Sequence, residues 1–179
     1  MMRNLPFIVL LLVAPLVGCS DDDTKSTIDA ALDDSTVMLE RARLALTAEP
    51  ADPVTPTEAK DLAAEPTEIV LAGKIDAGEF NPFQAGQATL MLSELPDEDH
   101  AAGDPEHAEN CKFCARRLAN APKVIVTFND ADGNLLEIGA KELFALEKGD
   151  SVVVTGTAQF QEATGTVTID ASGLYKRKS

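Results

Sequence analysis

The sequence predicts a mainly β fold for the region from about residue 68 to the end of the chain. Stretches of this region alternate apolar and polar residues, as half-buried strands do. Turn-forming residues separate these stretches, and one short stretch has helical propensity instead. The sequence therefore predicts five strands with a helix before the fourth, the strands lying at about 69–75, 88–92, 123–128, 151–160 and 166–174.

The first three predicted strands are bounded by residues that favour turns. Ile69–Ile75 alternates and is followed by Gly78, which permits a bend. Ala88–Leu92 alternates in the same way, and Lys123–Phe128 is rich in β-branched residues. The third strand ends at 129–134, where asparagine, aspartate and glycine predict a turn.

The predicted helix and the last two strands follow this turn. Residues 140–146 have helical propensity, and Lys148-Gly149 is typical of a helix C-terminus. Ser151–Phe160 and Thr166–Leu174 each place alternate apolar residues on one face, and a loop with Gly165 joins them.

The order of three strands, one helix and two strands resembles the OB-fold. The entry into the fourth strand carries the resemblance: a Gly149-Asp150 turn precedes alternating valines, and Gly156 permits a bend. The resemblance covers residues 68–176 and implies a small five-stranded Greek-key barrel. An insertion at 95–122 interrupts it, so the predicted domain is 68–179 with a cysteine- and histidine-containing insertion.

The first residues of the chain predict export. Arg3 precedes the apolar run Phe7–Val13, which is shorter than the about 20 residues needed to span a bilayer. The following Leu16-Val17-Gly18-Cys19 resembles the lipobox of bacterial lipoproteins. That resemblance implies a signal peptide at 1–18, cleavage before Cys19 and lipidation of its sulfur. The alternative is an ordinary secretory signal that contains a cysteine.

Residues 19–67 are predicted to form a lipidated tether with two parts. Apolar residues at three- and four-residue spacing between Ser26 and Ala48 predict an amphipathic helix, with Met38 and Leu39 on its apolar face. This helix is either a spacer, packed on the domain or loosely formed, or a surface for a partner or for self-association. Four prolines within 49–67 predict a semi-extended linker.

The compartment and the charge limit the partners. Ser20, beside the predicted lipidation site, resembles lipoproteins of the outer membrane, which implies an anchored protein facing the periplasm. The formal net charge of −15 disfavours nucleic acid, because phosphate backbones would be repelled. The membrane, contacted through the lipid anchor, and a protein of the cell envelope are the expected partners.

The insertion concentrates the groups that carry chemistry. Residues 95–110 contain six acidic residues, no lysine or arginine, and both histidines, His100 and His107. Asp104-Pro105 predicts the start of a helix running to about 119. On that helix His107, Cys111 and Cys114 would share one face, a ligand set suited to zinc or copper. His100, or Asp99 as the weaker candidate, would supply the fourth ligand.

Two alternatives to a metal site remain for the cysteines. Cys111 and Cys114 would form a disulfide in an oxidising compartment, or both would remain thiols. Cys111-Lys112-Phe113-Cys114 superficially resembles the thioredoxin-type site, whose first thiol lies at a helix N-terminus. The acidic loop before it differs from the buried strand of that family, and its carboxylates would raise a thiol pKa.

Taken together, these residues predict a membrane-anchored lipoprotein of the cell envelope. We expect a non-enzymatic interaction or ligand-binding module with a candidate metal site, since no catalytic constellation is assembled in the sequence. The alternative is a periplasmic thiol–disulfide exchange protein that uses the Cys111/Cys114 pair.

Overall fold

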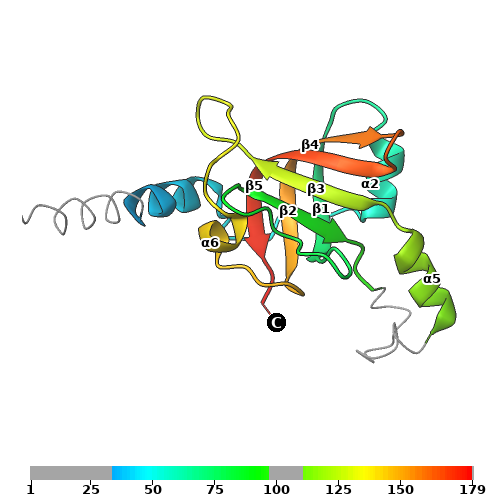
Figure 1. Cartoon of the computed structure of the whole chain (residues 1–179). Coiled ribbons are helices and arrows are strands. Elements are labelled where there is room, and N and C mark those ends of the chain that lie inside the picture. Colours follow the sequence, from blue (N-terminus) through cyan, green and yellow to red (C-terminus); the bar gives the residue numbers. More distant parts are fainter. Residues whose placement is uncertain (1–33, 97–110, 179) are drawn as a thin grey trace, which may run out of the picture.

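The computed structural model describes residues 34–96 and 111–178. Within them five strands close into a barrel: β1 (Thr67–Ile75), β2 (Thr89–Ser93), β3 (Lys123–Phe128), β4 (Ser151–Gln161) and β5 (Thr166–Lys176). The strands follow one another around the ring in the order β1-β2-β3-β5-β4 (Figure 1). β3 and β5 pair in parallel and the other neighbours pair antiparallel. This arrangement confirms the predicted five-stranded OB-like barrel.

The alternating residues of the strands fill the barrel. The largest of these buried side chains, each at most 1% exposed, are Leu71, Ile75, Leu90, Leu92, Val124, Val126, Phe128, Val152 and Ile169. At Gly156 the pairing of β4 with β5 shifts register. A Cβ there would collide with the backbone carbonyl oxygen of Asp170, so glycine is needed at this bulge.

Helix α6 (Ala140–Phe144) lies between β3 and β4, as predicted, and covers one end of the barrel (Figure 1). Its Leu143 is fully buried, and the ring of Phe144 lies 4.8 Å from that of Phe128. The helix ends earlier than the helical stretch in the sequence, because Ala145 adopts a left-handed conformation with φ of 52°.

The segment before β1 packs against the barrel, which corrects the prediction of a linker at 49–67 and of a domain beginning at 68. Val54 pairs in parallel with Leu71, its N–H donating to the Val70 carbonyl at 2.8 Å. Helix α2 (Pro56–Leu62) follows, and its Ala59 is fully buried. The prolines leave the N–H and carbonyl of Val54 available for pairing, so an extended proline-rich segment can still dock on a sheet.

The predicted N-terminal helix is present over residues 34–44, the part of it that the structure describes. It packs on the barrel through Val37 and Leu44, which are 5% and 1% exposed. The predicted apolar face is therefore wrong as the docking face, because Met38 and Leu39 are exposed to solvent. Within residues 34–96 and 111–178, no helix has the length and apolar character needed to cross a bilayer.

Candidate functional site

The predicted chemical site lies at the start of helix α5 (Lys112–Asn120), in the insertion between β2 and β3. The helix projects from the barrel, on the side opposite the N-terminal helix in Figure 1. None of its residues is buried, and Phe113 is 87% exposed. The core of the barrel therefore contributes little to holding this helix in place.

Cys111 is the N-cap of α5, which corrects the prediction of one helix from 105 to about 119. Its backbone is extended, with φ of −90° and ψ of 107°, so a helix cannot run through it. The prediction that His107 shares a helical face with Cys111 and Cys114 rested on that continuous helix. His107, His100, Asp99 and the predicted lipidation site Cys19 all lie outside the described residues.

The structure brings the two cysteines of the insertion together. The Cys111 sulfur accepts the backbone N–H of Cys114 at 3.4 Å, and both residues are partly exposed. The first turn of α5 contains no acidic residue. A sulfur at a helix N-terminus meets backbone N–H groups and the positive end of the helix dipole, and both stabilise a thiolate. A thiolate is the form that binds a metal or attacks a disulfide.

Within residues 34–96 and 111–178, no group of three histidine, cysteine or acidic side chains is placed to hold a metal ion. The described portion of the predicted centre thus consists of the Cys111/Cys114 pair. A zinc or copper site would need further ligands, and the predicted ones, His107 and His100, belong to residues 97–110.

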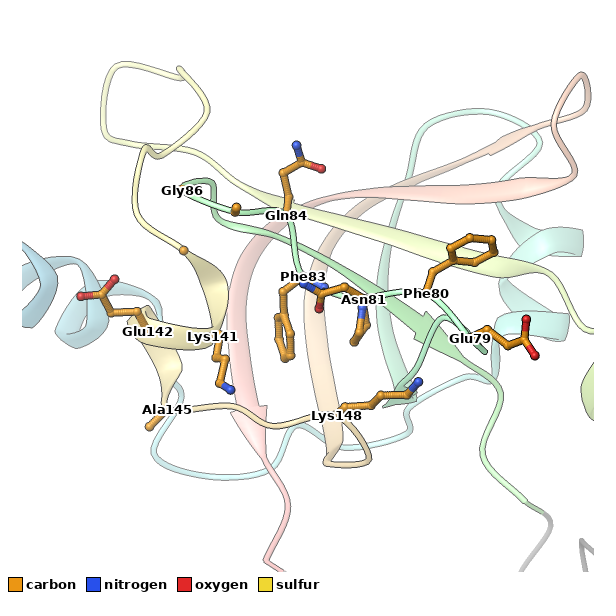
Figure 2. A pocket seen from close by; sticks show the side chains of 13 residues that line it. Glu79, Phe80, Asn81, Phe83, Gln84, Gly86, Lys141, Glu142, Ala145 and Lys148 are labelled. Carbon is orange, nitrogen blue, oxygen red and sulfur yellow. The ribbon is translucent and has the colours of Figure 1, made fainter.

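A second candidate site, not predicted from the sequence, lies between the β1–β2 loop and α6. It is an open groove of about 890 Å³. Figure 2 shows the ring of Phe83 in it, with the Lys141 side chain turned toward that ring from α6. The residues that line the groove are Glu79, Phe80, Asn81, Pro82, Phe83, Gln84, Ala85, Gly86, Gly139, Lys141, Glu142, Ala145 and Lys148.

The groove combines parts of the chain far apart in sequence. The loop at 76–88 contributes aromatic and amide side chains, and the segment from 139 to 148 contributes the lysines. Sequence reasoning treated the loop only as a bend and the helix only as a connection. The nearest signal was the pair of phenylalanines, Phe80 and Phe83, in a loop rich in turn-forming residues.

The turn after β3 is structural. Asp130 accepts the backbone N–H of Asn134 and of Asp132, both at 2.9 Å. These hydrogen bonds, that from Asn134 first, lower the pKa of the Asp130 carboxyl below its usual value. Its carboxylate thus stabilises the predicted turn.

Comparisons with known proteins are limited to folds. No protein-family model matches the chain, and no curated protein matches it. Similar solved structures include the aspartyl-tRNA synthetase of Entamoeba histolytica, with a TM-score of 0.43 and 10% identity, covering 97% of this chain and 28% of that one. A protein of Leishmania major Friedlin described as an aspartyl-tRNA synthetase has a TM-score of 0.40 and 7% identity, covering 80% and 26% of the two chains. The chain spans only about a quarter of the length of these proteins.

Proposed function

We propose that this protein is a lipoprotein of the cell envelope, anchored through Cys19, that works by binding rather than by catalysis. The lipobox-like Leu16-Val17-Gly18-Cys19 supports the anchor, and Ser20 supports an outer-membrane location facing the periplasm. The barrel would carry the binding surfaces, one of them the insertion with its candidate metal site. A protein of the envelope is the expected partner, and the net charge of −15 disfavours nucleic acid.

The exposure of α5 carries the metal proposal. A nine-residue helix with no buried side chain is marginal in water, because packing supplies most of the stability of helices in proteins. Such a segment needs another source of order, and a bound metal ion supplies one in many small modules. Cys111 and Cys114 would supply two thiolate ligands at its start, and His107 and His100 would complete a zinc or copper site.

Native mass spectrometry of the full chain under non-reducing conditions tests this proposal. We expect one zinc or copper ion per chain, lost in Cys111→Ser and in His107→Ala. Lys112→Ala is the matched control, since it changes the same helix without removing a ligand. After purification with zinc and copper, the chain could instead carry no metal and have a mass two hydrogens below that of the reduced chain. Such a chain would contain a disulfide and contradict the proposal.

A second candidate function is thiol–disulfide exchange, which the N-cap position of Cys111 favours. Its thiolate would attack a substrate disulfide, forming a mixed disulfide and releasing one substrate sulfur as a thiolate. Cys114 would then attack the Cys111 sulfur, release the second substrate sulfur and leave a Cys111–Cys114 disulfide. This candidate predicts reduction of insulin by the reduced chain and a Cys111 pKa well below about 8.5. A pKa near that value, without insulin reduction, would exclude it.

The anchor has its own test. Radiolabelled palmitate should be incorporated into the protein in bacteria and lost in Cys19→Ala. Cys114→Ala is the matched control, because it removes a cysteine that the lipobox does not involve. Palmitate incorporation that persists in Cys19→Ala would contradict the lipid anchor.

A further inference from the structure

The groove between the β1–β2 loop and α6 has the dimensions of a small-molecule site. Its volume of about 890 Å³ falls in the range of ligand pockets, about 300–1,000 Å³. None of the residues that line it belongs to the insertion at 95–122. The inference drawn from it is therefore independent of the metal and the anchor proposed above.

Backbone hydrogen bonds fix the loop that forms one wall of the groove. Pro82 accepts the N–H of Met91 at 2.8 Å, and the N–H of Gln84 donates to the Thr89 carbonyl at 3.1 Å. The loop thus runs along the edge of β2. It is also tied to α6, because the N–H of Ala140 donates to the Gln87 carbonyl at 3.2 Å. A wall held in this way is formed before a ligand arrives, which lowers the entropic cost of binding.

Among the charged side chains that line the groove, Lys141 is the one directed inward. Figure 2 shows Lys141 turned toward the Phe83 ring, whereas the carboxylates of Glu142 and Glu79 point outward on opposite sides. Lys148 is already engaged, since it donates to the Gly78 carbonyl and lies 3.6 Å from Asp76. Within the described residues Lys141 takes part in no salt bridge.

The amide of Asn81 adds a second donor beside the aromatic ring. Its Oδ1 accepts the backbone N–H of Phe83 at 3.1 Å, so this oxygen is used within the loop. The amide NH2 group remains as a donor, and Figure 2 shows the amide turned toward Phe83. An ammonium, an amide donor and the face of an aromatic ring together form the pattern that binds an anion attached to an apolar body.

We propose that this groove binds a small organic carboxylate whose apolar part lies against Phe83. The carboxylate would accept hydrogen bonds from Lys141 and from the Asn81 amide. The net charge of −15 opposes the approach of an anion from a distance, and the lysines offset this only locally. Binding should therefore not weaken as steeply with added salt as binding to a basic surface does.

NMR titration of the isotope-labelled full chain carrying Cys19→Ser tests the proposal, with 3-phenylpropionate as the probe. We expect the amide signals of Asn81, Phe83, Gly86 and Lys141 to shift together and to saturate. The neutral 3-phenylpropanol should bind at least about fivefold more weakly, the factor that corresponds to about 1 kcal/mol for a partly exposed ion pair.

Two variants separate recognition of the anion from apolar contact. Lys141→Met keeps the aliphatic stem and removes the charge, and should weaken phenylpropionate about fivefold while leaving phenylpropanol unchanged. Asn81→Asp keeps the acceptor for the Phe83 N–H and replaces the amide donor by a negative charge. It should therefore weaken the binding of phenylpropionate more than Lys141→Met does. Lys112→Met, on exposed α5, is the matched control and should have no effect. Equal binding of both probes, no shift in the groove, or an equal effect of Lys112→Met would overturn the proposal.

Discussion

Segment 49–67 and the insertion with α5 differ in how they meet the barrel, although the sequence predicts the first as a linker and the second as a helical insertion. The first segment pairs Val54 with β1 and buries Ala59 and Ala63 completely. Helix α5 buries none of its nine residues. Both segments contain a helix of similar length, and both lie beside the same barrel.

The difference lies in small apolar residues and backbone pairing. Ala63 accepts the N–H of Phe160 in β4 at 2.6 Å, so α2 is joined to the barrel by main-chain atoms as well as by packing. In α5 three of the nine side chains are lysine or arginine, Phe113 is apolar but exposed, and none is buried. The docked segment with α2 therefore belongs to the cooperative core of the barrel. Helix α5 depends on a stabilising interaction from outside that core.

Metal binding should bring the local stability of α5 closer to that of the docked segment, and this is the largest effect we expect. If zinc binds the insertion, saturation at about 100 times the dissociation constant adds about 2.7 kcal/mol of local stability. Amide hydrogen exchange in α5 should then slow by about 100-fold, while Val54 and Ala72 in the docked segment and β1 keep their rates. Exchange followed by mass spectrometry, with Cys111→Ser as the control, checks this. Equal slowing in both segments would contradict a site confined to the insertion.

The same enlargement of one alanine in each helix tests the packing difference. Ala59→Leu in α2 should destabilise the protein by about 1–3 kcal/mol, because the site is fully buried and has no room for three more carbons. Ala119→Leu in exposed α5 should change the free energy of unfolding by less than about 0.5 kcal/mol. Urea unfolding of both variants measures the two values. Similar losses would show that α5 packs as tightly as α2.

Sequence patterns were sufficient for the barrel and insufficient for its attachments. Alternation with a period of two located the strands, and the Gly156 bend corresponds to a real bulge between β4 and β5. Val54 docks on β1 through main-chain hydrogen bonds, and Ala59 docks because its side chain is small. Neither leaves a periodic signal among prolines, alanines and acidic residues, so the segment resembled a linker.

Sequence patterns misplaced the start of α5 and missed the groove, for different physical reasons. Asp104-Pro105 is a good helix start, yet the described helix begins at Lys112, with the sulfur of Cys111 as the N-cap acceptor in place of the usual oxygen. The groove depends on the loop at 76–88 folding against α6, a contact between distant residues that no local motif encodes. The structure places Cys111 and Cys114 at the start of α5, and a shared metal ion or a disulfide between them stays a prediction.

The N-terminal helix, like α2, is attached to the barrel, and its Arg41 makes part of that attachment. Arg41 donates to the Leu143 carbonyl at 2.6 Å through Nε and to the Glu142 carbonyl at 2.9 Å through Nη2, at the C-terminal end of α6. A cation is favourable there. Arg41→Met should therefore cost about 1–2 kcal/mol, and Arg116→Met in α5 should cost almost nothing. Thermal unfolding of the two variants checks this. A loss in Arg116→Met equal to that in Arg41→Met would be inconsistent with an α5 that buries none of its residues.

The smallest effect concerns the ion pair that joins the docked segment to the end of β5. Arg177 donates to Glu49 Oε1 from Nε at 2.9 Å and from Nη2 at 2.7 Å, and both side chains are partly exposed. Glu49→Gln keeps an oxygen acceptor and removes the charge. We expect a loss of about 0.5 kcal/mol at low salt that disappears near 1 M salt, because exposed pairs are screened.

Glu162→Gln is the control for that change, since Glu162 is exposed and forms no salt bridge with any residue that the structure describes. Urea unfolding at low and high salt compares the two variants. If Glu49→Gln instead cost several kcal/mol at both salt concentrations, the ion pair would hold the segment in place. The small, salt-screened loss that we expect would mean that the backbone pairing of Val54 and the buried alanines of α2 hold the segment in place. Helix α5 has no buried side chain of this kind.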